Sequence, residues 1–512
     1  MPLAKNENSI ADSVTIRVSV WLSLGYHLFL LVLFAGRAST GLIEFWAFVF
    51  CDILLSSFVL IPLVAVVRRR LVWFDPFSVL SFIFFGMVGM FYPAYLQDPI
   101  FVSYFSSHGG YPLSYLSEPA FLLLVVKAEL ILGAFWSIML LTNHRRLSSL
   151  QTRCTRGECR VALLATALCA IAGTVGFLSY WTLDSFIYAI TAGLGSIMVK
   201  SPLWGTSRFL LLVRMATTSF SLGLVGWVGL RKSPMQQPAG RFILLGSLVA
   251  AFLNLWNGAR GEVLFAFIIM FVIAGQFGFK IRKAMWLFMA GLVVTIVSVM
   301  TVLRQGSYTT YSPTDVVTQV VSRNAFREYS HGADFPLGTL LALDRISVLT
   351  MVLHYLDTIG TYLHGESLLA SPVNTAADWM SRISGSGRLE QGVLREANQV
   401  ITLWRRGSPA HEGVPPSFPG EFYLQAGVLS LLILSFLFGR AFWWLRKKIA
   451  GTESLIGRWF LTIIALHITL AFSAEVSVLT PVLLYLILPI LIVYRITKTM
   501  LGMRVRYVRW LN

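Results

Sequence analysis

Long apolar windows joined by short polar connections make up most of the chain. A helix of about 20 apolar residues can cross the roughly 30 Å hydrocarbon core of a membrane while satisfying its own backbone hydrogen bonds. The pattern therefore predicts an all-α, polytopic integral membrane protein with about twelve transmembrane helices. The windows lie at residues 18–36, 42–67, 77–96, 119–141, 161–181, 209–230, 241–256, 262–279, 284–303, 421–444, 458–474 and 478–495.

One long polar segment, residues 305–418, interrupts this pattern between the ninth and tenth windows. It divides the chain into a block of helices in 1–304, a large loop, and a second block in 419–512 that ends in a basic tail. Within the loop, apolar positions in 315–330 and 337–356 recur with a spacing near that of an α-helix. This spacing predicts amphipathic helices on the membrane surface.

The stretch 337–356 is also long enough to be a further crossing if Asp344 and Arg345 pair with each other. A crossing there would place the basic residues 446–448 and the basic tail on the outer side. Cytoplasmic connections normally carry the excess of Lys and Arg. We therefore expect 337–356 to stay outside the membrane, or to re-enter it without crossing.

The composition agrees with a membrane protein. Hydrophobic residues make up 56% of the chain and charged residues 13%, whereas soluble proteins carry about 25% charged residues. The net charge of +17 comes largely from basic clusters that share one side of the predicted arrangement, which favours cytoplasmic termini and an outer 305–418 loop. No nucleic-acid-binding motif accompanies the charge, so we expect no nucleic-acid partner. The basic clusters lie at 68–70, 145–160, 231–232, 280–283, 446–448 and 495–509.

Neither the cysteines nor the acidic residues predict a metal site. Cys154 and Cys159 share a basic inner connection, but two sulfurs without a nearby histidine are a poor zinc site. The outer segments contain no Asp-x-Asp pair. We expect neither a metal nor a cofactor.

Three arginines are expected at the outer ends of different helices. Arg260 lies at the tip of the turn Leu255-Trp-Asn-Gly-Ala-Arg260-Gly-Glu, Arg214 lies inside the sixth apolar window, and Arg304 ends the ninth. The Arg260 side chain either reaches up to the headgroups or binds an anion as a phosphate clamp. The second role is chemically suitable because a guanidinium donates two parallel hydrogen bonds to two phosphate oxygens. An arginine inside an apolar helix usually faces a partner or a polar cavity.

The large loop carries balanced charge. It contains eight arginines, no lysine and ten acidic residues, which argues against a polyanion bound over its whole surface. Arg323, Arg327 and His331 recur every four residues and so share one helical face, which is either solvated or a binding face. Local arginine clusters with nearby carboxylates and histidines fit a small anion and proton transfer better.

The loop returns to the membrane through Pro415-Pro-Ser-Phe-Pro-Gly-Glu421-Phe-Tyr423-Leu-Gln-Ala-Gly427. Glu421 falls in the first helical turn, where the helix macrodipole favours a negative charge. It is either an acid that stabilises the helix start or a general base at the boundary between water and membrane.

Three short motifs in the chain resemble those of bacterial oligosaccharide repeat-unit polymerases, the Wzy-type O-antigen polymerases. The first is the Asn257-Gly-Ala-Arg260-Gly turn. The second is Tyr362-Leu-His-Gly365-Glu-Ser367-Leu, and the third is a Pro-x-x-x-Gly-Glu-x-Tyr-x-x-x-Gly pattern from Pro416 to Gly427. The likeness covers residues 255–440, and the first half of the chain resembles the family in its helix layout.

The resemblance implies a glycosyltransferase of the bacterial inner membrane with a periplasmic active site. It would transfer a growing glycan from undecaprenyl pyrophosphate to a second lipid-linked repeat unit in O-antigen and lipopolysaccharide biosynthesis. The partners implied are undecaprenyl-pyrophosphate-linked oligosaccharides, the lipid bilayer and a chain-length-determinant membrane protein.

Roles for the charged residues follow from this chemistry. A pyrophosphate leaving group needs charge stabilisation, which arginines in a water-poor site supply without a metal. The pyrophosphate-binding candidates are Arg260, Arg214 and Arg304. The candidates for binding the second substrate are Arg323, Arg327 and Arg345. An attacking sugar hydroxyl also needs a base near neutral pH. The base candidates are Glu421, His411 and His354.

Two other functions share parts of this pattern. An O-antigen ligase has a similar helix layout and outer loop, but transfers the glycan to the lipid A core. A polysaccharide flippase or another secondary transporter also has about twelve helices, usually in two related halves with helices broken near the middle of the membrane. The sequence shows no such symmetry, and its single large loop favours an enzyme.

Overall fold

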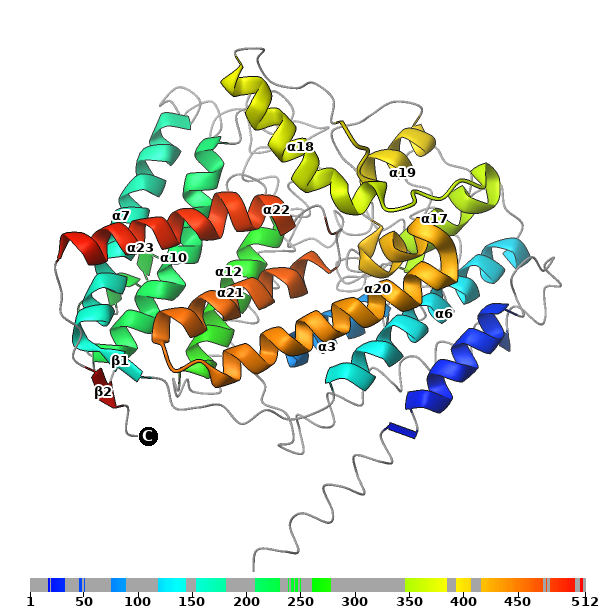
Figure 1. Cartoon of the computed structure of the whole chain (residues 1–512), viewed down its shortest axis with the longest axis horizontal. Helices are drawn as coiled ribbons and strands as arrows, with labels where there is room; N and C mark the ends of the chain where they lie inside the picture. The colour runs from blue at the N-terminus through cyan, green and yellow to red at the C-terminus, as the bar shows by residue number, and fades with distance from the viewer. Residues whose placement is uncertain are drawn as a thin grey trace, which may run out of the picture.

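A computed structural model of the chain shows a helical protein (Figure 1). The N-terminal helix Val20–Val32 precedes α3 (Pro76–Val88), α6 (Glu118–Asn143), α7 (Arg156–Tyr180), α10 (Arg208–Leu230) and α12 (Arg260–Gln276). The C-terminal half contains α17 (Ile346–Ile359), α18 (Glu366–Ile383), α19 (Ala397–Arg406), α20 (Ser417–Gly451), α21 (Leu455–Ala471), α22 (Leu479–Pro481), the π-helix η6 (Val482–Ile487) and α23 (Leu488–Met500). The residues described are 17–32 except 19, isolated positions among 46–50 and 238–249, 75–88, 118–143, 153–180, 208–230, 260–277, 346–384, 393–406, 416–472, 476, 479–501 and 507–509.

Four helices in the described part of the chain are long and apolar enough to cross a membrane. They are Pro119–Asn143, Arg156–Val175, Ser417–Gly451 and Val482–Met500. Each overlaps an apolar window predicted from the sequence, and the helices α10, α12 and α21 overlap three more. The chain is therefore a helical membrane protein. The predicted window 284–303 lies outside the described residues.

The helices surround two hydrophobic cores that share a border. One core joins the N-terminal helix, α3, α6, α17 and the first half of α20. The other joins α7, α10, α12, α21 and α23, which lie together on the left of Figure 1. The best-buried span is α6, with 94% of its most apolar window inside the protein, as expected of a helix that is hydrophobic on all sides.

A short β-ribbon closes one end of the second group of helices. Strand β1 (Arg153–Thr155) pairs antiparallel with β2 (Tyr507–Arg509), so the connection before α7 lies beside the C-terminal tail. In the first turn of α7, Glu158 forms a salt bridge with Lys498 of α23 at 3.8 Å. The sequence predicted both segments on the same side of the membrane, and their contact agrees with that arrangement.

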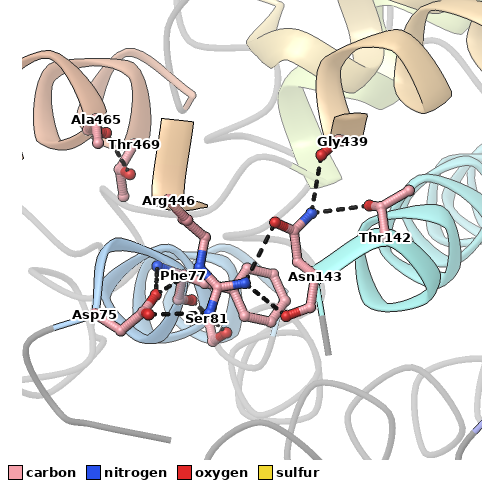
Figure 2. Close-up of polar contacts among 9 residues, drawn as sticks. All are labelled: Asp75, Phe77, Ser81, Thr142, Asn143, Gly439, Arg446, Ala465 and Thr469. Atoms are coloured by element: carbon pink, nitrogen blue, oxygen red, sulfur yellow. Dashed lines mark hydrogen bonds and ion pairs between the residues drawn. The ribbon is translucent and has the colours of Figure 1, made fainter. Parts of the chain in front are cut away.

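A buried ion pair ties the far end of α20 to α3 and α6 (Figure 2). The Arg446 guanidinium donates to both carboxylate oxygens of Asp75, at 2.8 and 2.9 Å, and to the Asn143 carbonyl at 2.7 Å. Asp75 also accepts from the backbone N–H of Phe77 at 2.8 Å, which caps α3. The sequence placed Arg446 within a basic surface cluster, but Arg446 is 2% exposed and serves as an internal tie, while Lys447 and Lys448 are exposed.

The described part of the large loop contains three helices. The helix α17 has 14 residues, and at 1.5 Å per residue it extends about 21 Å, less than the roughly 30 Å of the hydrocarbon core. It corresponds to the second part of the predicted stretch 337–356, of which residues 337–345 lie outside the described residues. The helices α18 and α19 were not predicted, and the predicted helix at 315–330 lies outside the described residues.

Candidate functional site

The candidate site is built around Glu421, which lies just beyond the first turn of α20 and not within it as predicted. The helix begins after Pro416, and the backbone N–H of Phe418 donates to the Phe472 carbonyl at 3.1 Å, which holds this end of α20 against the end of α21. The Glu421 side chain is fully buried. Its Oε1 accepts a hydrogen bond from the Ser367 hydroxyl at 2.9 Å, and its Oε2 accepts from the Val476 N–H at 2.7 Å.

Gln425 extends this network by one helical turn. Its side-chain amide donates to the Ser367 hydroxyl and to the Glu421 carbonyl, both at 2.9 Å. Its side-chain oxygen accepts from the Gly365 N–H at 2.7 Å. The carboxylate, the hydroxyl and the amide therefore form a continuous chain that joins the start of α18 to α20. Such fully satisfied buried networks make a local structure unique and rigid.

A break in α20 supplies the backbone partners of the α17–α18 connection. Ala426 and Gly427 have non-helical backbone angles, so the carbonyls just before them lose their usual helical partners. The Leu424 carbonyl accepts instead from the Leu363 N–H at 2.9 Å, and the Gln425 carbonyl from the His364 N–H at 3.1 Å. Buried backbone groups are nearly always paired, so the break and the connection depend on each other.

Gly427 is required at the break for two reasons. Its φ of +69° lies in the left-handed region that favours glycine. A Cβ atom there would also lie 3.1 Å from the Tyr362 hydroxyl. The motif from Tyr362 and the motif from Pro416 to Gly427 are therefore interlocked in space, and several of their named positions meet at this one contact region.

His364 is an exposed imidazole on the rim of this region, and the sequence interpretation did not select it. Its φ of +47° is unusual for a residue other than glycine, and such strained positions often occur at functional sites. Its ring packs edge-to-face on Tyr362, with ring centroids 6.4 Å apart. Its position inside the motif from Tyr362 to Leu368 could have marked His364 as a candidate site residue from the sequence. As an accessible base, His364 is better placed than Glu421, whose oxygens are both engaged and buried.

His354 lies on α17 and faces α19. Its ring packs edge-to-face on Trp404, with centroids 5.6 Å apart. Burial lowers the pKa of His354 below its usual value of 6.5, and the nearby Asp357 carboxylate partly offsets this effect. Among the described residues, no hydrogen bond links His354 to Glu421. Glu421 interacts electrostatically with a second carboxyl, that of Glu396, and burial raises the pKa of Glu396.

The predicted arginine cluster is described only in part. Arg260 is the first residue of α12, and Arg214 lies in the second turn of α10 and is partly exposed. These two helices are in contact, so the structure brings two of the three proposed pyrophosphate-binding positions onto neighbouring helices. The remaining candidates lie outside the described residues. They are Arg304, Arg323, Arg327, Arg345 and His411.

Within the described ranges, no group of three or more His, Cys, Asp or Glu side chains is arranged to hold a metal ion. Comparison of the chain with protein-family models, with curated proteins and with solved structures gives no match.

Proposed function

We propose that this protein is a membrane glycosyltransferase that polymerises lipid-linked oligosaccharide repeat units. The observation that carries the proposal is the meeting of two motifs that resemble those of repeat-unit polymerases. Although Ser367 and Glu421 are 54 residues apart, their side chains are hydrogen-bonded in the interior. Each of the two short motifs resembles the same family by itself. If these likenesses were accidental, there would be no reason for the two motifs to meet in one hydrogen-bond network.

The contacts between helix ends support one location for the site. The pairs Asp75–Arg446 and Glu158–Lys498 join segments that the charge distribution assigns to the cytoplasm. The Glu421–Val476 pair joins segments assigned to the opposite side. We therefore propose a bacterial inner-membrane protein with cytoplasmic termini and a periplasmic active site. Its proposed partners are undecaprenyl-pyrophosphate-linked oligosaccharides and a chain-length-determinant membrane protein.

The proposed reaction needs little from the protein beyond charge and one base. An acceptor sugar hydroxyl attacks the anomeric carbon of the donor, and the bond from that carbon to the pyrophosphate oxygen breaks. Undecaprenyl pyrophosphate leaves with the electron pair, and its charge is stabilised by the arginines at Arg260, Arg214 and Arg304. The hydroxyl proton passes to a base, for which His364 joins the earlier candidates Glu421, His411 and His354.

The buried network gives Glu421 a positioning role in this proposal. Its carboxylate holds Ser367 and the Val476 backbone, and so fixes the connection that presents His364. A base needs to reach the proton that it removes, and the exposed His364 ring can do so without rearrangement of the helix. His364 is accordingly the base that we place first.

The decisive experiment is a reaction of the purified full-length protein with defined undecaprenyl-pyrophosphate repeat units, read as polymer length. Arg260→Ala should abolish long products, and Arg260→Lys should fail as well if paired hydrogen bonds to phosphate are needed. His364→Ala should reduce turnover by about a hundredfold or more, the usual contribution of a general base. The matched control is Thr361→Ala, in the same connection, which should leave the rate within about twofold of wild type.

Three outcomes would contradict the proposal. Normal long products from Arg260→Ala would exclude the phosphate clamp. In cells that lack the protein, bare lipid A core instead of core with single repeat units would indicate a ligase. Movement of an intact lipid-linked sugar across vesicles, without any new glycosidic bond, would indicate a transporter.

A further inference from the structure

A second site lies at the opposite end of α20. A cavity of about 500 Å³ opens between the N-terminal helix, the end of α6 and the second half of α20. It is lined by Arg17, Trp21, Leu24, Ile138, Leu141, Thr142, Phe436, Arg440 and Trp443. It lies beside the Arg446–Asn143 contact and far along α20 from Glu421, so it is separate from the proposed active site.

The lining changes from charged to apolar along the helices. On the N-terminal helix, Leu24 lies seven residues beyond Arg17, which is about 10 Å deeper at 1.5 Å per residue. On α20, Phe436 lies one turn deeper than Arg440, and on α6, Ile138 lies one turn deeper than Thr142. All three helices therefore place polar side chains at the mouth and apolar side chains below them.

The mouth of the cavity suits a phosphate group. Arg17 and Arg440 are both exposed, and none of the residues that line the cavity is acidic. Guanidinium groups bind phosphate oxygens in pairs. Trp21 is 61% exposed, and Trp443 borders the same opening. Tryptophan is favoured at the headgroup level of a membrane, and each tryptophan lies within about one helical turn of the arginine on its own helix.

We propose that this cavity binds an anionic glycerophospholipid. The phosphate lies between Arg17 and Arg440, and the first part of an acyl chain lies against Leu24, Ile138 and Phe436. Basic pockets between transmembrane helices are a recognised form of lipid site, and this one combines charge with an apolar floor at the correct depth. Because the lipid would bridge the N-terminal helix and α20, it stabilises their packing. The proposal is independent of the enzymatic activity.

Native mass spectrometry of the purified full-length protein tests the site with phosphatidylglycerol, phosphatidylcholine, undecaprenyl phosphate and inorganic phosphate as probes. Phosphatidylglycerol should bind in preference to the other three. The double variant Arg17→Gln/Arg440→Gln should bind it roughly thirtyfold more weakly, from the loss of two basic side chains at the headgroup level. Lys447→Gln, an exposed change on the same helix end that does not line the cavity, should stay within about twofold.

The proposal is overturned if the double variant retains phosphatidylglycerol as wild type does, or if phosphatidylcholine binds equally well. Selection of undecaprenyl phosphate would assign the site to a different lipid, and displacement of the lipid by inorganic phosphate would show a site for a free anion. If the double variant does not fold, brominated phosphatidylglycerol replaces it as the test. The contribution of Trp21 to the fluorescence of the protein is the difference between wild type and Trp21→Phe. Bromine in the acyl chain should quench this contribution, and absence of that quenching overturns the proposal.

Discussion

The two ends of α20 each bury a charged side chain, but they hold it in different ways. Arg446 meets the opposite charge of Asp75 directly and donates a third hydrogen bond to the Asn143 carbonyl. Glu421 is held by two neutral donors, a hydroxyl and a backbone N–H. The helix is continuous beside Arg446, whereas it is broken five residues after Glu421.

The difference indicates which end is a structural anchor and which end is a site. A buried ion pair with satisfied geometry fixes the relative position of helices and leaves little freedom. A carboxylate in a network of neutral donors, next to a broken helix and a strained exposed histidine, has the features of a functional region. Changes at the two ends should therefore differ in what they affect.

The largest expected effect comes from breaking the anchor. Arg446→Met leaves Asp75 without its cation in a mostly buried position, and should lower the free energy of unfolding by about 3 kcal/mol. Unfolding of the purified protein in detergent micelles measures this. The double variant Arg446→Met/Asp75→Asn should recover most of the loss, since no unpaired charge remains. If the double variant is as unstable as the single one, the ion pair is not the cause.

The other end should respond less in stability and more in activity. Glu421→Ala removes the acceptor for two buried donors and should lower the free energy of unfolding by about 2 kcal/mol. Glu421→Gln keeps one acceptor oxygen, so its free energy of unfolding should fall by about half as much. Polymer length should shorten in both, because the connection that carries His364 is no longer held. Asp357→Asn, an exposed change nearby, is the control, and an equal loss in that variant would contradict the argument.

The break in α20 should be sensitive to a single methyl group. Gly427→Ala forces a left-handed backbone on alanine and crowds the Tyr362 hydroxyl, which should reduce stability by about 1.5 kcal/mol. Tyr362→Phe removes the crowding but not the backbone strain. The double variant Gly427→Ala/Tyr362→Phe should therefore recover only part of the lost stability. Gly451→Ala, at an open position at the end of the same helix, should cost little. Equal effects at Gly427 and Gly451 would refute the role assigned to the break.

The smallest effect concerns pH and the neighbouring α17. Burial lowers the pKa of His354 in the folded protein below 6.5. The unfolded chain therefore takes up the proton first as pH falls below about 6.5, and stability is lost through that window. Above it, His354 is neutral in both states and contributes no pH dependence. His354→Gln should flatten this part of the stability profile, measured as the difference from wild type between pH 7.5 and pH 5. A profile unchanged by the substitution would contradict the assignment.

Much of the helical layout could be predicted because it depends on local composition. The apolar windows at 119–141 and 421–444 correspond to α6 and α20, since any helix there must be apolar over this length to lie in a membrane. The helices α18 and α19 were missed although both are strongly amphipathic, because they are polar on average and so give no long apolar window. The motif from Tyr362 was recognised, but its contact with Gly427 could not be, because no sequence pattern states which turn meets which helix.

The sequence by itself determined the membrane class, the positions of the main helices and the short motifs that suggest a polymerase. These properties depend on residues close together in the chain, where hydrophobic length and turn chemistry act. Only the tertiary structure decided that Arg446 is an internal anchor and that Glu421 is enclosed by Ser367 and Gln425. Arg446 and Asp75 are 371 positions apart, and whether a charge is exposed or paired depends on which distant segments the packing of helices brings to it.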